Sequence, residues 1–309
     1  MLEPHSSFVD ADEVRLHYLE WDPAVIRPAQ LGSGQENSDN VPLVLFHGLG
    51  ASADTWRLTA EYLCEQYHVL AFDLRGHGLS DQPEQGYDIS LIAEDTISSM
   101  AQLGLGQIAL VGHGWGARVA LVLAARHPAL VSHLILVDCP HVEPRHWPGM
   151  TRERFLQERI LLDRYESRDA YLDVYREDLQ DVWSSEIENI VCSYMCEMPD
   201  GQMVGRLRPA CQVQIRESFW NDRALSYYSK LTCPVLLIPA AVKPEPGVEP
   251  PERLEQADDF AALKGQMAAQ VARMIQRCSV LWMPQTSHDI QLQRPELLAH
   301  AILDFLQTS

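Results

Sequence analysis

The sequence predicts an α/β protein with a mostly parallel central sheet and helices on both faces. Short, continuously apolar segments of the length of buried strands recur along the chain, and helical patterns separate most of them. The expected strands are 42–46, 68–72, 108–112, 133–138, 234–240 and 279–284, with a further alternating strand at 14–21. The expected helices are 54–66, 89–104, 115–127, 260–277 and 295–307.

One part of the chain differs from this pattern. Residues 141–229 are rich in arginine, glutamate and aromatic residues and contain long helical stretches. We expect them to form a helical cap, inserted into a core made of residues 1–140 and 230–309. The Pro- and Glu-rich stretch 242–260 predicts a loop.

Composition limits the class of protein. The chain has 309 residues, 46% of them hydrophobic, and a formal net charge of −19 that disfavours nucleic acids and anionic membranes as partners. It has no apolar run long enough to span a membrane and no signal-peptide pattern at its N-terminus. Seven scattered cysteines are typical of reduced thiols. We expect a cytoplasmic protein without cofactor or metal, which binds a small apolar substrate; a homodimer is left open.

The segment VGHGWGARVA, from Val111 to Ala120, joins an expected strand to an expected helix. Gly112 and Gly116 suit the sharp turn of a nucleophile elbow, the motif G-x-S-x-G. This chain has Gly114 where the motif has serine. A phosphate-binding glycine loop is the alternative, but such a loop is expected in the first strand–helix unit, which this segment is not.

Three further segments follow expected strands in the order of one family. They are FHGLGAS (46–52), DLRGHGLSD (73–81) and PQTSHDI (284–290). Together with the elbow, they resemble the α/β-hydrolase-fold enzymes that have a helical cap, over nearly the whole chain. The elbow also resembles those of epoxide hydrolases and dehalogenases, in which an aspartate stands between the histidine and the tryptophan.

The resemblance implies roles for individual residues. His288 takes the position of the catalytic base, and the backbone N–H groups of Leu49 and Trp115 would form an oxyanion hole. Asp73 and Arg75 would tie loops together. The acid that orients His288 is either Asp138 or Glu245, and we favour Asp138.

Other residues of the same types are expected to be structural. We interpret Cys139 as a buried, inert thiol and four further histidines as structural; these are His47, His77, His113 and His127. Some of the cap aromatics are expected to form the roof of an apolar pocket.

Three functions fit these features. In the first, the chain is a hydrolase of an apolar ester, lactone or related acyl compound in which Gly114 replaces a serine nucleophile. In the second, an aspartate nucleophile was replaced, as in an epoxide hydrolase or dehalogenase. In the third, Gly114 is native, and the protein either binds a ligand without catalysis or uses His288 to activate water or to abstract a substrate proton, as in a lyase.

Overall fold

The computed structural model describes residues 3–22, 41–139, 141, 143–147, 149–157, 164–241 and 265–308. Within these ranges, the main sheet has eight strands in the order β1-β2-β4-β3-β5-β6-β10-β12. In chain order these are β1 (His5–Ala11), β2 (Val14–Trp21), β3 (Leu43–Phe46), β4 (Val69–Phe72), β5 (Ile108–His113), β6 (Val131–Val137), β10 (Val235–Ile238) and β12 (Cys278–Val280). Strands β4, β3, β5, β6, β10 and β12 run parallel to one another. At the other end of the sheet, β2 pairs antiparallel with both β1 and β4.

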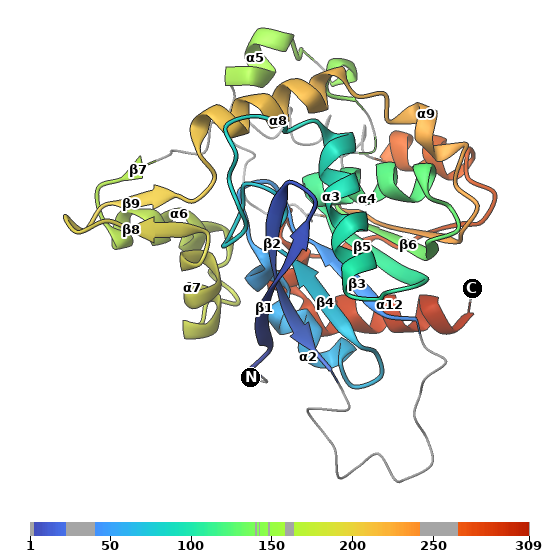
Figure 1. Ribbon diagram of the computed structural model, residues 1–309, viewed down its shortest axis with the longest axis horizontal. Coiled ribbons are helices and arrows are strands. Elements are labelled where there is room, and N and C mark those ends of the chain that lie inside the picture. Colours follow the sequence, from blue (N-terminus) through green and yellow to red (C-terminus); the bar gives the residue numbers. More distant parts are fainter. Residues whose placement is uncertain are drawn as a thin grey trace, which may run out of the picture.

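Helices cover both faces of this sheet (Figure 1). One face packs against α3 (Ile89–Gln102) and α4 (Gly114–Arg126), and the other packs against α2 (Arg57–Leu63) and α12 (Pro295–Thr308). Neighbouring residues of each strand join opposite layers, because side chains alternate across a strand. In β3, for example, Phe46 belongs to the layer of α4 and Leu45 to that of α12. The predicted fold class is confirmed.

The segment between β6 and β10 contains a small sheet in addition to the expected helices. It contains the helices η2 (Pro144–His146), α5 (Arg152–Gln157), α6 (Arg168–Asp178), α7 (Ser185–Cys192), α8 (Pro209–Asn221) and α9 (Leu225–Tyr228). It also contains a small sheet of β7 (Arg164–Tyr165), β8 (Met195–Glu197) and β9 (Met203–Gly205), whose strands are too short to show a periodic pattern. Figure 1 shows α8 above the main sheet, with β7 to β9, α6 and α7 grouped at its side. The interpretation of residues 141–229 as a cap stays a prediction.

Smaller differences concern single elements. The expected strand at 279–284 is divided into β12 and β13 (Met283–Pro284), and β13 pairs with β11 (Ala240–Ala241) in a separate sheet. The expected helix at 54–66 begins with a 3₁₀ turn, η1 (Ala53–Trp56). The expected helix at 260–277 starts outside the described residues and is helical at 265–272. Among the helices of the described ranges, none has the length and hydropathy needed to cross a membrane.

Candidate active site

The elbow predicted at residues 112–116 is a tight crossing of β5 and α4. Gly114 begins α4 with a positive φ of 54°. An added Cβ at Gly112 would lie 2.5 Å from the Cα of Ala117, and one at Gly116 would lie 2.2 Å from the carbonyl oxygen of His47. Both contacts are shorter than atoms allow, so the outer glycines permit the backbone crossing that presents position 114.

The chain after β3 lies directly against this elbow. It turns at Gly48, whose carbonyl accepts a hydrogen bond from the N–H of Ala51, and Gly50 has a φ of +79°. The Cα of Gly48 lies 3.8 Å from the point where a Cβ of Gly114 would stand. The next residue, Leu49, is therefore close to position 114. The N–H of Trp115 belongs to the first turn of α4, where backbone donors have no acceptor within the helix.

His288 and Asp138 form a hydrogen-bonded pair at the same edge of the sheet. The distance between His288 Nδ1 and Asp138 Oδ2 is 2.7 Å. A carboxylate can only accept, so Nδ1 is the protonated nitrogen and the neutral ring has its lone pair at Nε2. The other carboxylate oxygen, Oδ1, accepts from the N–H of Ala240 at 3.1 Å. Asp138 has a φ of +38°, an uncommon conformation for a residue other than glycine.

The Nε2 edge of this imidazole faces Gly114. An added Cβ on Gly114 would lie 3.1 Å from His288 Nε2 and 3.2 Å from its Cε1. The side chain of His288 is 58% exposed, whereas that of Asp138 is 3% exposed. The pair thus combines a buried acid with an imidazole that solvent can reach.

His113 supports the backbone of His288, a contact that the sequence did not predict. Its Nε2–H donates to the carbonyl oxygen of His288 at 2.9 Å, and the two ring centroids are 4.5 Å apart. Burial, followed by the nearby His288, lowers the pKa of His113 to about 4. His113 is therefore a neutral donor at ordinary pH. The position of His113 next to the elbow is the feature of the sequence that could have indicated this supporting role.

Asp73 ties loops together as expected, whereas Arg75 joins its loop to helix α3. Asp73 is buried and accepts hydrogen bonds from the backbone N–H groups of Ala53 and Leu79 at 2.6 and 2.9 Å, and from His17 Nδ1 at 2.7 Å. Arg75 donates to both carboxylate oxygens of Asp95, at 2.6 and 2.8 Å.

The remaining predicted histidines lie outside the Gly114–His288 contact. His47 Nε2 accepts from the N–H of Leu74 at 3.0 Å, and His77 Nδ1 donates to the carbonyl oxygen of Arg75 at 3.0 Å. His127 pairs with Glu94 at 3.1 Å on the surface.

Glu245 and Cys139 are the two other side chains considered for the site. Glu245 lies outside the described residues, so the structure gives only the contact of Asp138. Burial raises the pKa of Cys139 to about 12. That thiol remains protonated at neutral pH and is a poor nucleophile.

Eight aromatic residues of the 141–229 segment form two groups. Phe155 packs against Trp147, Phe219 and Trp220 with ring centroids 5.7 to 5.8 Å apart. The second group surrounds a cavity of about 30 Å³, which borders Gly50 and has the volume of one water molecule. Its tyrosines are Tyr165, Tyr171, Tyr175 and Tyr194.

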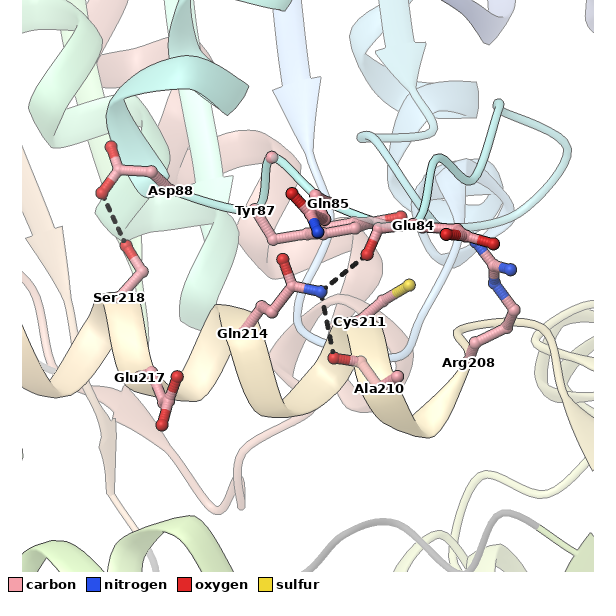
Figure 2. A pocket seen from close by; sticks show the side chains of 11 residues that line it. Glu84, Gln85, Tyr87, Asp88, Arg208, Ala210, Cys211, Gln214, Glu217 and Ser218 are labelled. Carbon is pink, nitrogen blue, oxygen red and sulfur yellow. Dashed lines mark hydrogen bonds between the residues drawn. The ribbon is translucent and has the colours of Figure 1, made fainter.

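A larger crevice of about 790 Å³ lies between residues 84–88 and α8 (Figure 2). Gln214 Nε2 donates to the carbonyl oxygen of Glu84 at 2.8 Å, and Ser218 Oγ donates to Asp88 Oδ2 at 3.2 Å. The residues lining this crevice do not include any of the predicted site residues. In the part of the chain that the structure describes, no group of three or more His, Cys, Asp or Glu residues could hold a metal ion.

Known proteins are similar to this chain in sequence and in fold. Residues 41–167 match the model of a family described as the alpha/beta hydrolase fold. Epoxide hydrolase 3 of Xenopus tropicalis is 32% identical over 131 residues, which are 42% of this chain and 35% of that protein. The 2-(acetamidomethylene)succinate hydrolase of Mesorhizobium japonicum is 38% identical over 104 residues, which are 33% of this chain and 37% of that protein.

The aligned region thus spans about a third of the length of these curated relatives. A crystal structure of E-2-(acetamidomethylene)succinate hydrolase matches over 99% of this chain and 100% of its own, with a TM-score of 0.75 and 22% identity. Together with the sheet order, the elbow and the family match, this structural likeness shows that the chain has the α/β-hydrolase fold.

Proposed function

We propose that this protein is a hydrolase whose reacting centre is the His288–Asp138 pair at the elbow. The observation that supports this most directly is the 2.7 Å contact between His288 Nδ1 and Asp138 Oδ2, with Nε2 turned toward Gly114. An orienting carboxylate that holds one imidazole tautomer is the arrangement used for proton transfer in hydrolytic triads. In this proposal, Asp138 rather than Glu245 is the acid.

The proposed substrate is an apolar ester, lactone or related acyl compound. The N–H groups of Leu49 and Trp115 would stabilise the oxyanion that forms when its carbonyl is attacked. Support also comes from the names of the matched proteins, which are hydrolases.

Gly114 has no side chain, so it cannot form an acyl-enzyme at the elbow. Our first proposal is that a serine here completes the triad, with His288 as its base. The test is Gly114→Ser, assayed on aryl esters of increasing acyl length. We expect kcat/KM to rise at least about 100-fold, since loss of a triad nucleophile costs several orders of magnitude.

Matched variants identify the source of any gain. Gly114→Ala adds the same Cβ, 3.1 Å from His288 Nε2, without a hydroxyl, and should give no increase. Gly114→Ser combined with His288→Ala should lose the gain. If Gly114→Ser and Gly114→Ala remain equally inactive, the serine proposal is wrong.

An aspartate at position 114 is the second candidate. It is supported by the position of Asp138 directly after β6, where certain dehalogenases take their acid, and by the similarity to an epoxide hydrolase. Gly114→Asp should then turn over epoxides or haloalkanes, while Gly114→Ser should not. Activity of the serine variant on esters alone would exclude this candidate.

A cytoplasmic location is proposed on the state of the cysteines. The described structure has none of the seven in a disulfide bond, and four of them are buried, as expected in a reducing compartment.

A further inference from the structure

We propose that in the chain as it stands, His288 is itself the nucleophile and forms an acyl-imidazole at Nε2. This inference rests on the proposed function and assigns the step that a glycine at position 114 leaves open. Histidine is among the side chains that form covalent intermediates in enzymes. The alternative is that His288 acts as a general base on a water molecule.

The distance between the imidazole and position 114 supports nucleophilic attack. The point where a Cβ would stand on Gly114 is 3.1 Å from His288 Nε2, tighter than ordinary contact with a side-chain carbon. The imidazole thus stands close to space that a serine would occupy. A substrate carbonyl carbon in that space would lie within the 3 to 3.5 Å typical of a near-attack geometry.

The surroundings of the imidazole fit the charge changes of such a step. The lone pair is at Nε2 because Asp138 accepts the Nδ1–H, and the buried carboxylate at 2.7 Å would stabilise the cationic acyl-imidazolium. His113 holds the carbonyl oxygen of His288 at 2.9 Å, which fixes the backbone of the attacking residue. The N–H groups of Leu49 and Trp115 would border the same space in this proposal and would stabilise the oxyanion.

Attack by Nε2 leads to hydrolysis of the ester in two steps. The Nε2 lone pair forms a bond to the carbonyl carbon, the C–O bond to the alcohol breaks, and the alkoxide leaves with a proton from water. Water then attacks the acyl carbon, the C–N bond breaks, and its electrons return to Nε2. The products are a carboxylate, an alcohol and one proton released to solvent. The 58% exposure of His288 gives water access for the second step.

Acylation by p-nitrophenyl trimethylacetate tests the proposal, because its hindered acyl group is hydrolysed slowly. The unmodified chain is incubated with the ester, quenched in acid, digested and analysed by peptide mass spectrometry. We expect one trimethylacetyl group on the peptide that contains His288. Asp138→Asn should slow the labelling at least about 100-fold, because it removes the acceptor that selects the reactive tautomer.

His127→Ala is the matched control, because His127 is also an exposed imidazole paired with a carboxylate, Glu94, at 3.1 Å. It should leave the label at His288 unchanged, whereas His288→Ala should abolish it. In Gly114→Ser the label is expected to move to the introduced hydroxyl, since this hydroxyl would stand between the imidazole and the substrate carbonyl and would have His288 as its base.

The remaining outcomes separate this inference from the proposed function. Ester turnover that depends on His288 but gives no acyl adduct would mean general-base catalysis on water, which overturns the nucleophile and leaves the hydrolase. Equal labelling of His127 and His288, insensitive to Asp138→Asn, would be non-specific acylation and also overturns it. If neither the unmodified chain nor any position-114 variant turns over an ester, epoxide or haloalkane, the proposed function itself fails.

Discussion

Gly114 has two properties that a side chain would disturb. Its φ of +54° lies in the left-handed region, and an added Cβ would press on His288 at 3.1 Å. We predict that Gly114→Ala lowers the free energy of unfolding by about 1 to 2 kcal/mol for the backbone conformation, plus a further contribution from the contact. Urea denaturation of both proteins measures the difference.

Gly104 supplies the control for that prediction. It has a similar φ of +70°, but an added Cβ there would meet no atom within 4 Å. Gly104→Ala therefore reports the cost of the backbone conformation alone. If Gly114→Ala is no less stable than Gly104→Ala, the imidazole moves aside freely, and the close contact at position 114 does not constrain the site.

The residues of the site were accessible to sequence reasoning to different degrees. Gly114, Leu49 and His288 follow from motifs at fixed places after strands. Glycines mark the turns that contain Gly114 and Leu49, whereas the segment that contains His288 has none and is identified by its position before the last helix. The choice between Asp138 and Glu245 did not follow, because the contact of an acid with His288 depends on two chain segments about 150 positions apart. Whether Asp138 is the catalytic acid stays a prediction that its hydrogen bond supports.

At the scale of elements, the close approach of α4 to the sheet decides whether the elbow forms. An added Cβ at Gly116 would lie 2.2 Å from the carbonyl oxygen of His47, which belongs to backbone and cannot rotate away. We predict that Gly116→Ala costs more than about 3 kcal/mol, as overpacking at a backbone contact forces the elements apart. Thermal and urea unfolding measure it.

Gly106→Ala is the control for this crossing. Gly106 lies in the connection between α3 and β5, and an added Cβ there meets nothing within 4 Å. This variant should be as stable as the unmodified chain or slightly more stable. A Gly116→Ala protein with unchanged stability would show that α4 can shift outward without loss.

The same helix is joined to the end of α8 by a buried ion pair. Arg118 is fully buried, and its Nη1 donates to Asp222 Oδ2 at 2.8 Å. We predict that Asp222→Asn destabilises the protein by about 3 to 5 kcal/mol, because it leaves a buried guanidinium without its counter-charge. Equilibrium unfolding in urea at neutral pH gives the value.

Two further variants test the ion-pair prediction. Arg118→Met in the Asp222→Asn background removes the uncompensated charge and should recover part of the loss. Arg126→Met breaks an exposed pair, in which the atoms are 3.8 Å apart, and should change stability by less than about 1 kcal/mol. Equal effects of Asp222→Asn and Arg126→Met would contradict the prediction.

Element types were predictable where a pattern was long enough to repeat. The buried strands of the main sheet and the long helices α3, α4 and α12 have apolar residues at a clear period. By contrast, β1 is largely exposed, so it lacks a strong apolar pattern and was missed. The strands β7, β8 and β9 have only two or three residues each, and their pairing is set by tertiary contacts.

The parallel sheet explains how distant segments of the chain meet. Leu49 follows β3, Gly114 follows β5, and Asp138 follows β6. The carboxyl ends of these neighbouring parallel strands lie at one edge, which is where open α/β sheets bind ligands. His288 reaches the same edge from the connection after β13. The fold therefore assembles the candidate site without requiring any of these residues to be close in sequence.

The interior around this edge contains neutral histidines, which predicts a pH dependence of stability. Burial lowers the pKa of His47, that of His77 to about 3 and that of His113 to about 4. In the unfolded chain these residues titrate near about 6.5. Between these values the unfolded state binds more protons than the native state, so the free energy of unfolding falls as the pH falls.

We therefore expect that these histidines do not reduce the free energy of unfolding above about pH 6.5. From there toward about pH 4, they should reduce it progressively. Each buried histidine contributes up to about 1.4 kcal/mol per pH unit in that window. Urea denaturation at pH 7.5, 6.0 and 5.0 measures the slope, and His77→Gln should reduce it by about the share of one group, because glutamine does not titrate. His300→Gln, at an exposed position, should leave the slope unchanged. If His77→Gln and the unmodified chain lose stability in parallel down to pH 5, His77 is protonated in the native state, and its imidazole is less enclosed than its 1% exposure indicates.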